Sequence, residues 1–159
     1  MDPDLAQKLR GLLDAQRIGS LGTLHQGEPF VSMVPFAIPP GTTDFVIHVS
    51  QLAAHTKDML ASPSVSLLVI APLSATAPPQ AVARMTIQGD AVRLDPASTE
   101  YATAKKTYLA RFPDSEMTFE LGDFSIFAIR PRQIRYVGGF AQAKSLTAAG
   151  LGEALGVRP

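Results

Sequence analysis

Four residues of one short segment, Ser50, His55, Thr56 and Lys57, have side chains that suit the binding of an anion. Two hydroxyls, an imidazole and an ammonium group lie where an apolar, strand-like run gives way to a helix. Free backbone N–H groups and the helix dipole favour negative charge at such a connection, so a phosphate is the natural ligand. In the structural alternative, Ser50 caps the helix expected over 51–61 and Lys57 is a solvated surface residue.

The apolar run 82–94 carries two further polar candidates. Arg84 lies among apolar residues, which predicts that its guanidinium is partly buried and paired, and the planar fork of that group suits phosphate. The alternative is a structural ion pair with Asp90 or Asp44. Gln88 follows on the same run, where it either reaches a cofactor or is an exposed strand residue.

The three histidines differ in their surroundings. His25 falls in a predicted turn, so solvent exposure is expected. His48 alternates with apolar neighbours, which places it against a partner subunit or a cofactor, or makes it a partly buried histidine with its hydrogen bonds satisfied. His55 alone lies in the anion-binding segment.

Other motifs and the composition restrict the function. There is no HExxH, GxSxG or P-loop motif and no paired spacing of metal ligands, so no metal site is predicted. Fourteen basic residues balance fourteen acidic ones without a basic block, which argues against nucleic acid and membrane surfaces as partners. The absence of cysteine excludes disulfides and iron–sulfur clusters. With no long apolar run and no signal-peptide pattern, a soluble cytoplasmic protein is expected.

Strands joined by short turns dominate the expected structure. Leucines at helical spacing after Asp2-Pro3 predict an N-terminal helix, and Asp95-Pro96 opens another that runs to about Leu109. Residues 72–80 contain three prolines and form a surface loop. The predicted strands cover 18–24, 29–38, 45–49, 65–70, 82–94, 124–129 and 133–137, with a bulge at Gly89.

These elements predict a mainly β fold with flanking helices, in which the strands form an antiparallel barrel. At 159 residues the chain is expected to form one domain. Residues 1–143 contain the predicted strands. Residues 144–159 are expected to be a tail that is weakly helical or partly disordered.

Five short motifs resemble the pyridoxamine 5'-phosphate oxidase-like FMN-binding split barrels, and among them the haem-utilisation subgroup. The motifs, whose order and spacing carry the resemblance over about residues 17–143, are SMVPF at 32–36, HTK at 55–57, ARMT at 83–86, DF at 123–124 and GGFAQA ending at residue 143. The resemblance implies a six-stranded, Greek-key-like split β-barrel. It also implies a homodimer whose interface completes two FMN sites.

The resemblance assigns roles to particular residues. Ser50, His55, Thr56, Lys57 and Arg84 would hold the FMN phosphate, and Gln88 could reach the ring or the ribityl chain. The strand Ser32, Met33, Val34 and Pro35 would run beside the flavin ring and contact it mainly through backbone groups. A flavin-dependent oxidoreductase acting on a small molecule is therefore expected, with a non-catalytic flavin-binding protein as the alternative.

Haem is the other cofactor that the resemblance implies, in a haem-binding or haem-degrading protein of the haem-utilisation type. Members of the subgroup carry a further C-terminal domain, and some supply a haem-ligating histidine from the tail. This sequence has no histidine after His55, so the haem iron would need His25, His48, His55 or a tyrosine as its ligand, or would have no protein ligand. The arginine-rich substrate segment of the pyridoxamine phosphate oxidases is also not evident, which argues against their activity.

Overall fold

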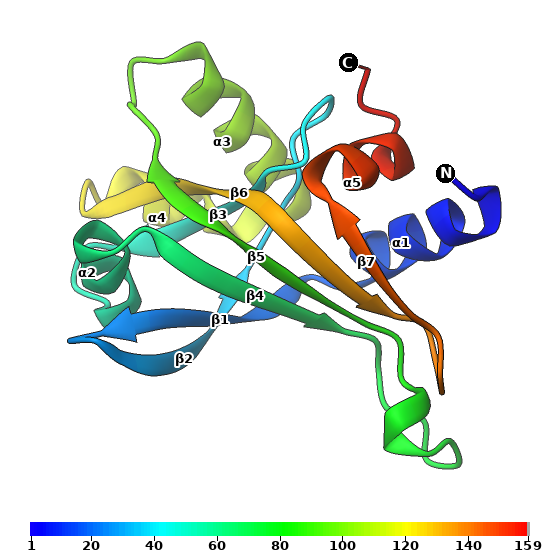
Figure 1. The fold of residues 1–159 in the computed structure, drawn as a ribbon. Coiled ribbons are helices and arrows are strands. Elements are labelled where there is room, and N and C mark those ends of the chain that lie inside the picture. Colours follow the sequence, from blue (N-terminus) through cyan, green and yellow to red (C-terminus); the bar gives the residue numbers. More distant parts are fainter. Residues whose placement is uncertain (159) are drawn as a thin grey trace.

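Alternating apolar and polar residues produce a curled, antiparallel sheet of seven strands with helices packed against it (Figure 1). The computed structural model describes residues 1–158. In chain order the α-helices and strands are α1 (Pro3–Ala15), β1 (Ile18–His25), β2 (Glu28–Pro35), β3 (Phe45–Ser50), α2 (Ala54–Ala61), β4 (Ser64–Ile70), β5 (Arg84–Arg93), α3 (Thr99–Arg111), α4 (Glu116–Glu120), β6 (Phe124–Val137), β7 (Ala143–Thr147) and α5 (Ala148–Leu155).

The order of strands in the sheet is β2-β1-β4-β5-β6-β3, and β7 also pairs with β6. Just beyond β2, Ala37 forms an isolated bridge with Val46 of β3, which draws the two ends of the sheet together. The sheet therefore curls into a barrel that is only partly closed. This is the predicted mainly β split barrel, with β2 at its open edge.

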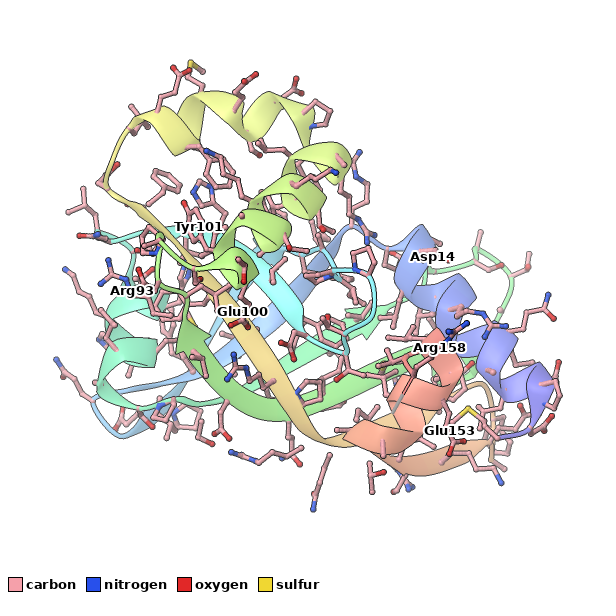
Figure 2. All side chains as sticks on the ribbon, turned by 90° about the horizontal axis from the view of Figure 1, so that it is seen from above. Asp14, Arg93, Glu100, Tyr101, Glu153 and Arg158 are labelled. Atoms are coloured by element: carbon pink, nitrogen blue, oxygen red, sulfur yellow. The ribbon has the colours of Figure 1, made fainter. Side chains whose placement is uncertain are left out.

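Two apolar cores hold the fold together. The larger fills the barrel and extends under α1 and α5. The smaller lies between strands β3 and β6 and helix α3, with Phe119 of α4 packed against it. Seen from above, α1 and α5 lie together at one end of the sheet, and α3 and α4 cover the other (Figure 2).

The predicted bulge at Gly89 is confirmed by a shift in the pairing of β5 and β6. A Cβ atom at Gly89 would overlap the carbonyl oxygen of Arg130, so only glycine fits this close approach. Pro131 lies opposite Gly89, where the disturbed pairing tolerates its missing N–H. The two strands predicted at 124–129 and 133–137 are consequently one continuous strand, β6.

The residues predicted as a tail form β7 and α5, both of which pack on the barrel. The side-chain hydroxyl of Thr147 accepts a hydrogen bond from the N–H of Gly150 and so caps α5, which buries Leu151 and Ala154 against the main core. Gly156 ends the helix with a φ of 72°. Within residues 1–158, no helix is both long and apolar enough to cross a membrane.

Candidate functional site

Helix α2 begins at Ala54, after a tight turn that the sequence analysis placed inside the helix. The hydroxyl oxygen of Ser50 accepts a hydrogen bond from the N–H of Leu52 at 3.1 Å, and the Ser50 carbonyl accepts one from the N–H of Ala53 at 3.2 Å. Ala53 occupies the N-cap position, and no side chain caps the helix. The structural alternative, in which Ser50 is the cap, is therefore wrong.

The uncapped start of α2 leaves donors available for an anion. No hydrogen bond within residues 1–158 uses the backbone N–H of Ala54 or His55. The side chain of Lys57 is exposed and forms no ion pair in the same part of the chain. Two open N–H groups with one ammonium group nearby suit a single anionic group, either a phosphate or a carboxylate.

Thr56 has a structural role in the turn. Its buried hydroxyl donates a hydrogen bond of 2.6 Å to the carbonyl of Ser50, which ties the end of β3 to α2. That proton is therefore not available to a phosphate. His55 lies beside Thr56 on α2, and its Nδ1 is 3.0 Å from the hydroxyl oxygen of Ser32 on β2.

The side chains of the predicted ring-binding strand point alternately to the two faces of β2. Ser32 and Val34 point to the inner face, and Val34 is buried in the core. Met33 and Pro35 lie on the outer face, where Met33 is 60% exposed. Because β2 is an edge strand, only one side of it pairs with another strand along its length, which suits the expected backbone contacts.

Arg84 lies at the opposite end of the sheet from α2. It pairs with Ile70 at the end of β4, whereas α2 leads into the start of that strand at Ser64. Six residues of strand separate these points by about 20 Å, so one protomer does not bring Arg84 and Lys57 to the same phosphate. The Arg84 guanidinium instead donates to the carbonyl of Val82 at 3.0 Å.

The ion pairs considered for Arg84 are also wrong. Asp90 pairs with Arg132, and the nearest cation to Asp44 is Arg130 at 3.8 Å. Gln88 lies four residues after Arg84 on β5, and its exposed side chain is on the outer face of the sheet. It borders a shallow groove of about 250 Å³.

A buried carboxylate next to the predicted anion-binding turn is the main feature that the sequence analysis missed. Asp58 on α2 is only 5% exposed, and its Oδ2 accepts a hydrogen bond of 2.8 Å from the Thr23 hydroxyl. Its Oδ1 lies 2.7 Å from Nδ1 of His25. Burial raises the pKa of Asp58, but the hydrogen bonds from His25 and Thr23 outweigh it and hold the pKa below the ordinary value.

His25 is thus more ordered than a solvent-exposed turn residue. Its side chain is 45% exposed, yet one ring nitrogen is fixed by Asp58, and the ring of Phe30 lies 5.5 Å away. A hydrogen bond between β1 and α2 that spans 33 residues has no local sequence pattern. The only available signal is the spacing of His55 and Asp58, three apart on one helix face.

His48 is buried in an aromatic cluster and not in the site. Its ring stacks on Phe119 at 3.6 Å with an angle of 7°, and Tyr108 packs edge-on at 5.7 Å. Burial, aided by the charge of Lys105, lowers the pKa of His48 to about 4. The imidazole is therefore neutral at physiological pH, and its Nδ1 is 3.3 Å from the Thr118 hydroxyl.

These residues define one continuous strip along the open edge of the barrel, which we call the α2–β2 seam. Phe30 and Ser32 point to the inner face of β2, where Phe30 meets His25 at the end of β1 and Ser32 meets His55 on α2. Residues two apart on a strand, such as these, are separated by about 7 Å. The seam consists of His25, Phe30, Ser32, His55 and Asp58. Its two imidazoles lie at different positions along the same edge, and His55 lies in the first turn of α2.

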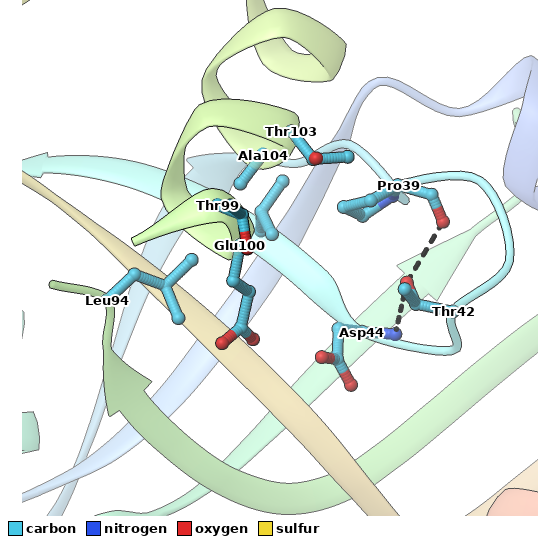
Figure 3. Close-up of a pocket in the computed structure, with 9 residues that line it drawn as sticks. Pro39, Thr42, Asp44, Leu94, Thr99, Glu100, Thr103 and Ala104 are labelled. Atoms are coloured by element: carbon cyan, nitrogen blue, oxygen red, sulfur yellow. Dashed lines mark hydrogen bonds between the residues drawn. The ribbon is translucent and has the colours of Figure 1, made fainter. Parts of the chain in front are cut away.

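A separate cavity of about 210 Å³ lies between α3 and the chain leading into β3 (Figure 3). Its carboxylates, Asp44 and Glu100, share the guanidinium of Arg130 as a counter-ion. It contains none of the predicted site residues, and its volume is below that of typical cofactor pockets. No group of three or more His, Cys, Asp or Glu residues in the part of the chain that the structure describes could hold a metal ion.

Comparison with known proteins agrees with this architecture. The family model for pyridoxamine 5'-phosphate oxidase matches residues 5–138. The non-canonical haem oxygenase HOZ of Arabidopsis thaliana, a chloroplastic protein, is 37% identical over 141 residues, which cover 86% of this chain and 41% of the relative. The chain thus spans less than half the length of that relative.

Solved structures show the same fold. A haem-binding protein from Mycobacterium smegmatis matches with a TM-score of 0.85 and 29% identity, over 96% of this chain and 62% of that one. HutZ, a haem storage protein from Vibrio cholerae, matches with a TM-score of 0.72 and 22% identity, over 84% and 92% of the two chains, and supports the fold alone. The chain therefore belongs to the pyridoxamine 5'-phosphate oxidase family and has its split-barrel fold.

Proposed function

We propose that this protein binds haem along the α2–β2 seam, as a homodimer. The observation that carries the proposal is that one exposed edge combines an uncapped helix start, an accessible aromatic ring and two imidazoles. These are the groups that a haem requires: partners for carboxylates, a surface for the ring and a nitrogen ligand for iron. The haem-related names of the Arabidopsis and Mycobacterium proteins support the same choice.

The seam and the adjoining start of α2 fit haem in the following way. Lys57 and the open N–H groups of Ala54 and His55 would hold a propionate carboxylate. Phe30, which is 37% exposed, offers its ring to the macrocycle. Bound haem would supply a redox-active iron, and the protein would contribute position, charge and shielding from water.

FMN is the second candidate, favoured by the same turn because an uncapped helix start also suits a phosphate. An FMN-dependent oxidoreductase acting on a small molecule would use that site. However, of the two cations proposed to hold the phosphate, Lys57 alone lies at the turn within one protomer, since Arg84 lies at the far end of the sheet. A doubly charged phosphate would then be only partly neutralised, whereas one carboxylate would be matched.

The proposed dimer forms through the outer face of the sheet. Large apolar side chains are exposed there on three strands, and in an isolated protomer they would face water. They are Ile18 (51%), Val31 (68%), Met33 (60%) and Ile70 (42%). A second copy of the chain is the expected cover, because the same patch on both copies makes a self-complementary interface. This interface would adjoin the seam, since β2 carries residues of both.

Titration of the ligand-free protein with ferric haem, followed at the Soret band, tests the proposal. A shift that saturates at one haem per chain is expected. A parallel titration with FMN, followed by flavin fluorescence, should show weaker binding. Saturable binding of FMN, with no saturable change on adding haem, would overturn the haem assignment and establish the flavin one.

Replacing Lys57 with alanine should weaken haem binding about tenfold, because one exposed, charge-assisted hydrogen bond contributes about 1.5 kcal/mol. The dissociation constant from the same Soret titration measures the effect. Lys105→Ala, on α3, is the matched control and should leave the affinity unchanged. Equal affinities for Lys57→Ala and the unaltered protein would remove Lys57 from the site.

A further inference from the structure

The sequence contains three histidines, and the structure places each in a different environment. His48 is only 8% exposed and is stacked on Phe119, so it has no free side on which to accept a large ligand. His25 and His55 both border the seam. Which of these two could bind the haem iron depends on which ring nitrogen is free, and on how firmly the position of the ring proton is fixed.

His55 has no fixed tautomer. Its Nδ1 lies 3.0 Å from the hydroxyl oxygen of Ser32, and a hydroxyl can either donate or accept a hydrogen bond. The neutral ring can therefore carry its proton on either nitrogen. Nothing else within residues 1–158 is hydrogen-bonded to the His55 side chain to select one form.

His25 is fixed by a group that can only accept. The carboxylate of Asp58 accepts the Thr23 hydroxyl proton on Oδ2, and its Oδ1 lies 2.7 Å from Nδ1 of His25. Nδ1 must therefore carry the proton and donate it to the carboxylate. The neutral ring then has its lone pair on Nε2, which forms no hydrogen bond in the described part of the chain.

The carboxylate itself is held in position from behind. Thr23 on β1 donates to Oδ2 of Asp58 at 2.8 Å, and Asp58 is buried under the hairpin. A buried carboxylate behind an imidazole is the arrangement that orients metal-ligating histidines and makes their free nitrogen more basic. This chain of Thr23, Asp58 and His25 connects a rigid strand to a half-exposed ring.

The position of His25 is also suitable for a ligand of the haem iron. Phe30 lies 5.5 Å from its ring and also lines the groove of about 250 Å³ that runs across β1 and β2. His25 therefore lies in the seam, next to an aromatic residue that also lines this groove. Lys57 is adjacent in sequence to Asp58. The helix that orients His25 therefore also carries the cation of the predicted anion site.

We propose that Nε2 of His25 is the protein ligand of the haem iron, with Asp58 as the carboxylate that orients it and Thr23 as the residue that fixes Asp58. This inference rests on the proposed haem function and adds the iron ligand to it. It assigns the ligand to the β1–β2 hairpin.

The test is the iron–histidine stretching band in resonance Raman spectra of the ferrous haem complex, together with haem affinity. In His25→Gly the band should disappear and the dissociation constant should rise at least about tenfold. Added imidazole should restore the band by filling the space left by the ring. His25→Gln retains an N–H donor for Asp58 and lacks a ring nitrogen, so a folded His25→Gln protein should also lack the band.

Two other variants separate ligation from a structural role. Asp58→Asn should keep the band but move it to lower frequency, because a neutral amide makes the imidazole less basic. His55→Gly removes the rival imidazole and should retain the band, and His48→Phe, which lies outside the seam, is the control. Persistence of the band in both His25 variants, or its loss in His55→Gly, overturns the assignment while haem binding stands. Absence of any saturable Soret change in the unaltered protein overturns the haem function and this inference together.

Discussion

Replacing Met33 with aspartate is expected to separate the proposed homodimer into monomers. Met33 is 60% exposed on the outer face of β2, within the proposed interface. Each dimer would bury two uncompensated carboxylates, and each is expected to cost about 3 kcal/mol or more. The dimer dissociation constant should therefore rise at least about a thousandfold, as measured by sedimentation equilibrium.

Met117→Asp is the matched control for this prediction. Met117 lies on α4, away from the outer face, and is 70% exposed, so the control introduces the same charge on a surface of similar exposure. It should leave the association state unchanged. A Met33→Asp protein that stays dimeric would show that the outer face is not the interface.

Acid should destabilise the protein through His48 well before its carboxylates are protonated. The folded-state pKa of His48 is about 4, against 6.5 for the ordinary side chain. Above pH 6.5 the ring is neutral in both states, so its contribution to stability is fully present. Between pH 6.5 and 4 only the unfolded chain takes up the proton, and the free energy of unfolding should fall by about 3 kcal/mol in total.

Denaturant unfolding at a series of pH values measures this slope. His48→Phe keeps an aromatic ring against Phe119 and removes the titrating group, so its stability should depend less on pH over the same range. Some slope should persist, because burial also lowers the pKa of His55. Identical slopes for His48→Phe and the unaltered protein would mean that His48 is not the group responsible.

Local patterns were sufficient to predict most of the barrel. The hairpin of β1 and β2 follows from β-branched and aromatic runs around a Gln-Gly turn, where Gln26 and Gly27 both have positive φ. The bulge at Gly89 was also predictable, because a glycine inside a strand pattern marks a close backbone approach. β7 was not predicted, since it is short and mostly exposed and depends on pairing with β6.

The site was less predictable, because its contacts join residues that are far apart in sequence. The segment 50–57 was found from residue types alone, but the role of Thr56 depends on a hydrogen bond to a backbone carbonyl. The pairing of His25 with Asp58 depends on how α2 packs against the hairpin. Arg84 was grouped with Lys57 because both are cations, and only the strand register places them at opposite ends of the sheet.

Native mass spectrometry of the purified protein, mixed with one equivalent of haem per chain, tests the central proposal most directly. It reports the association state and the bound ligand in one spectrum. A dimer that carries two haem molecules is the predicted species, and Met33→Asp should shift it to monomers. A chain that stays free of haem under these conditions, whether monomeric or dimeric, would contradict the proposed function.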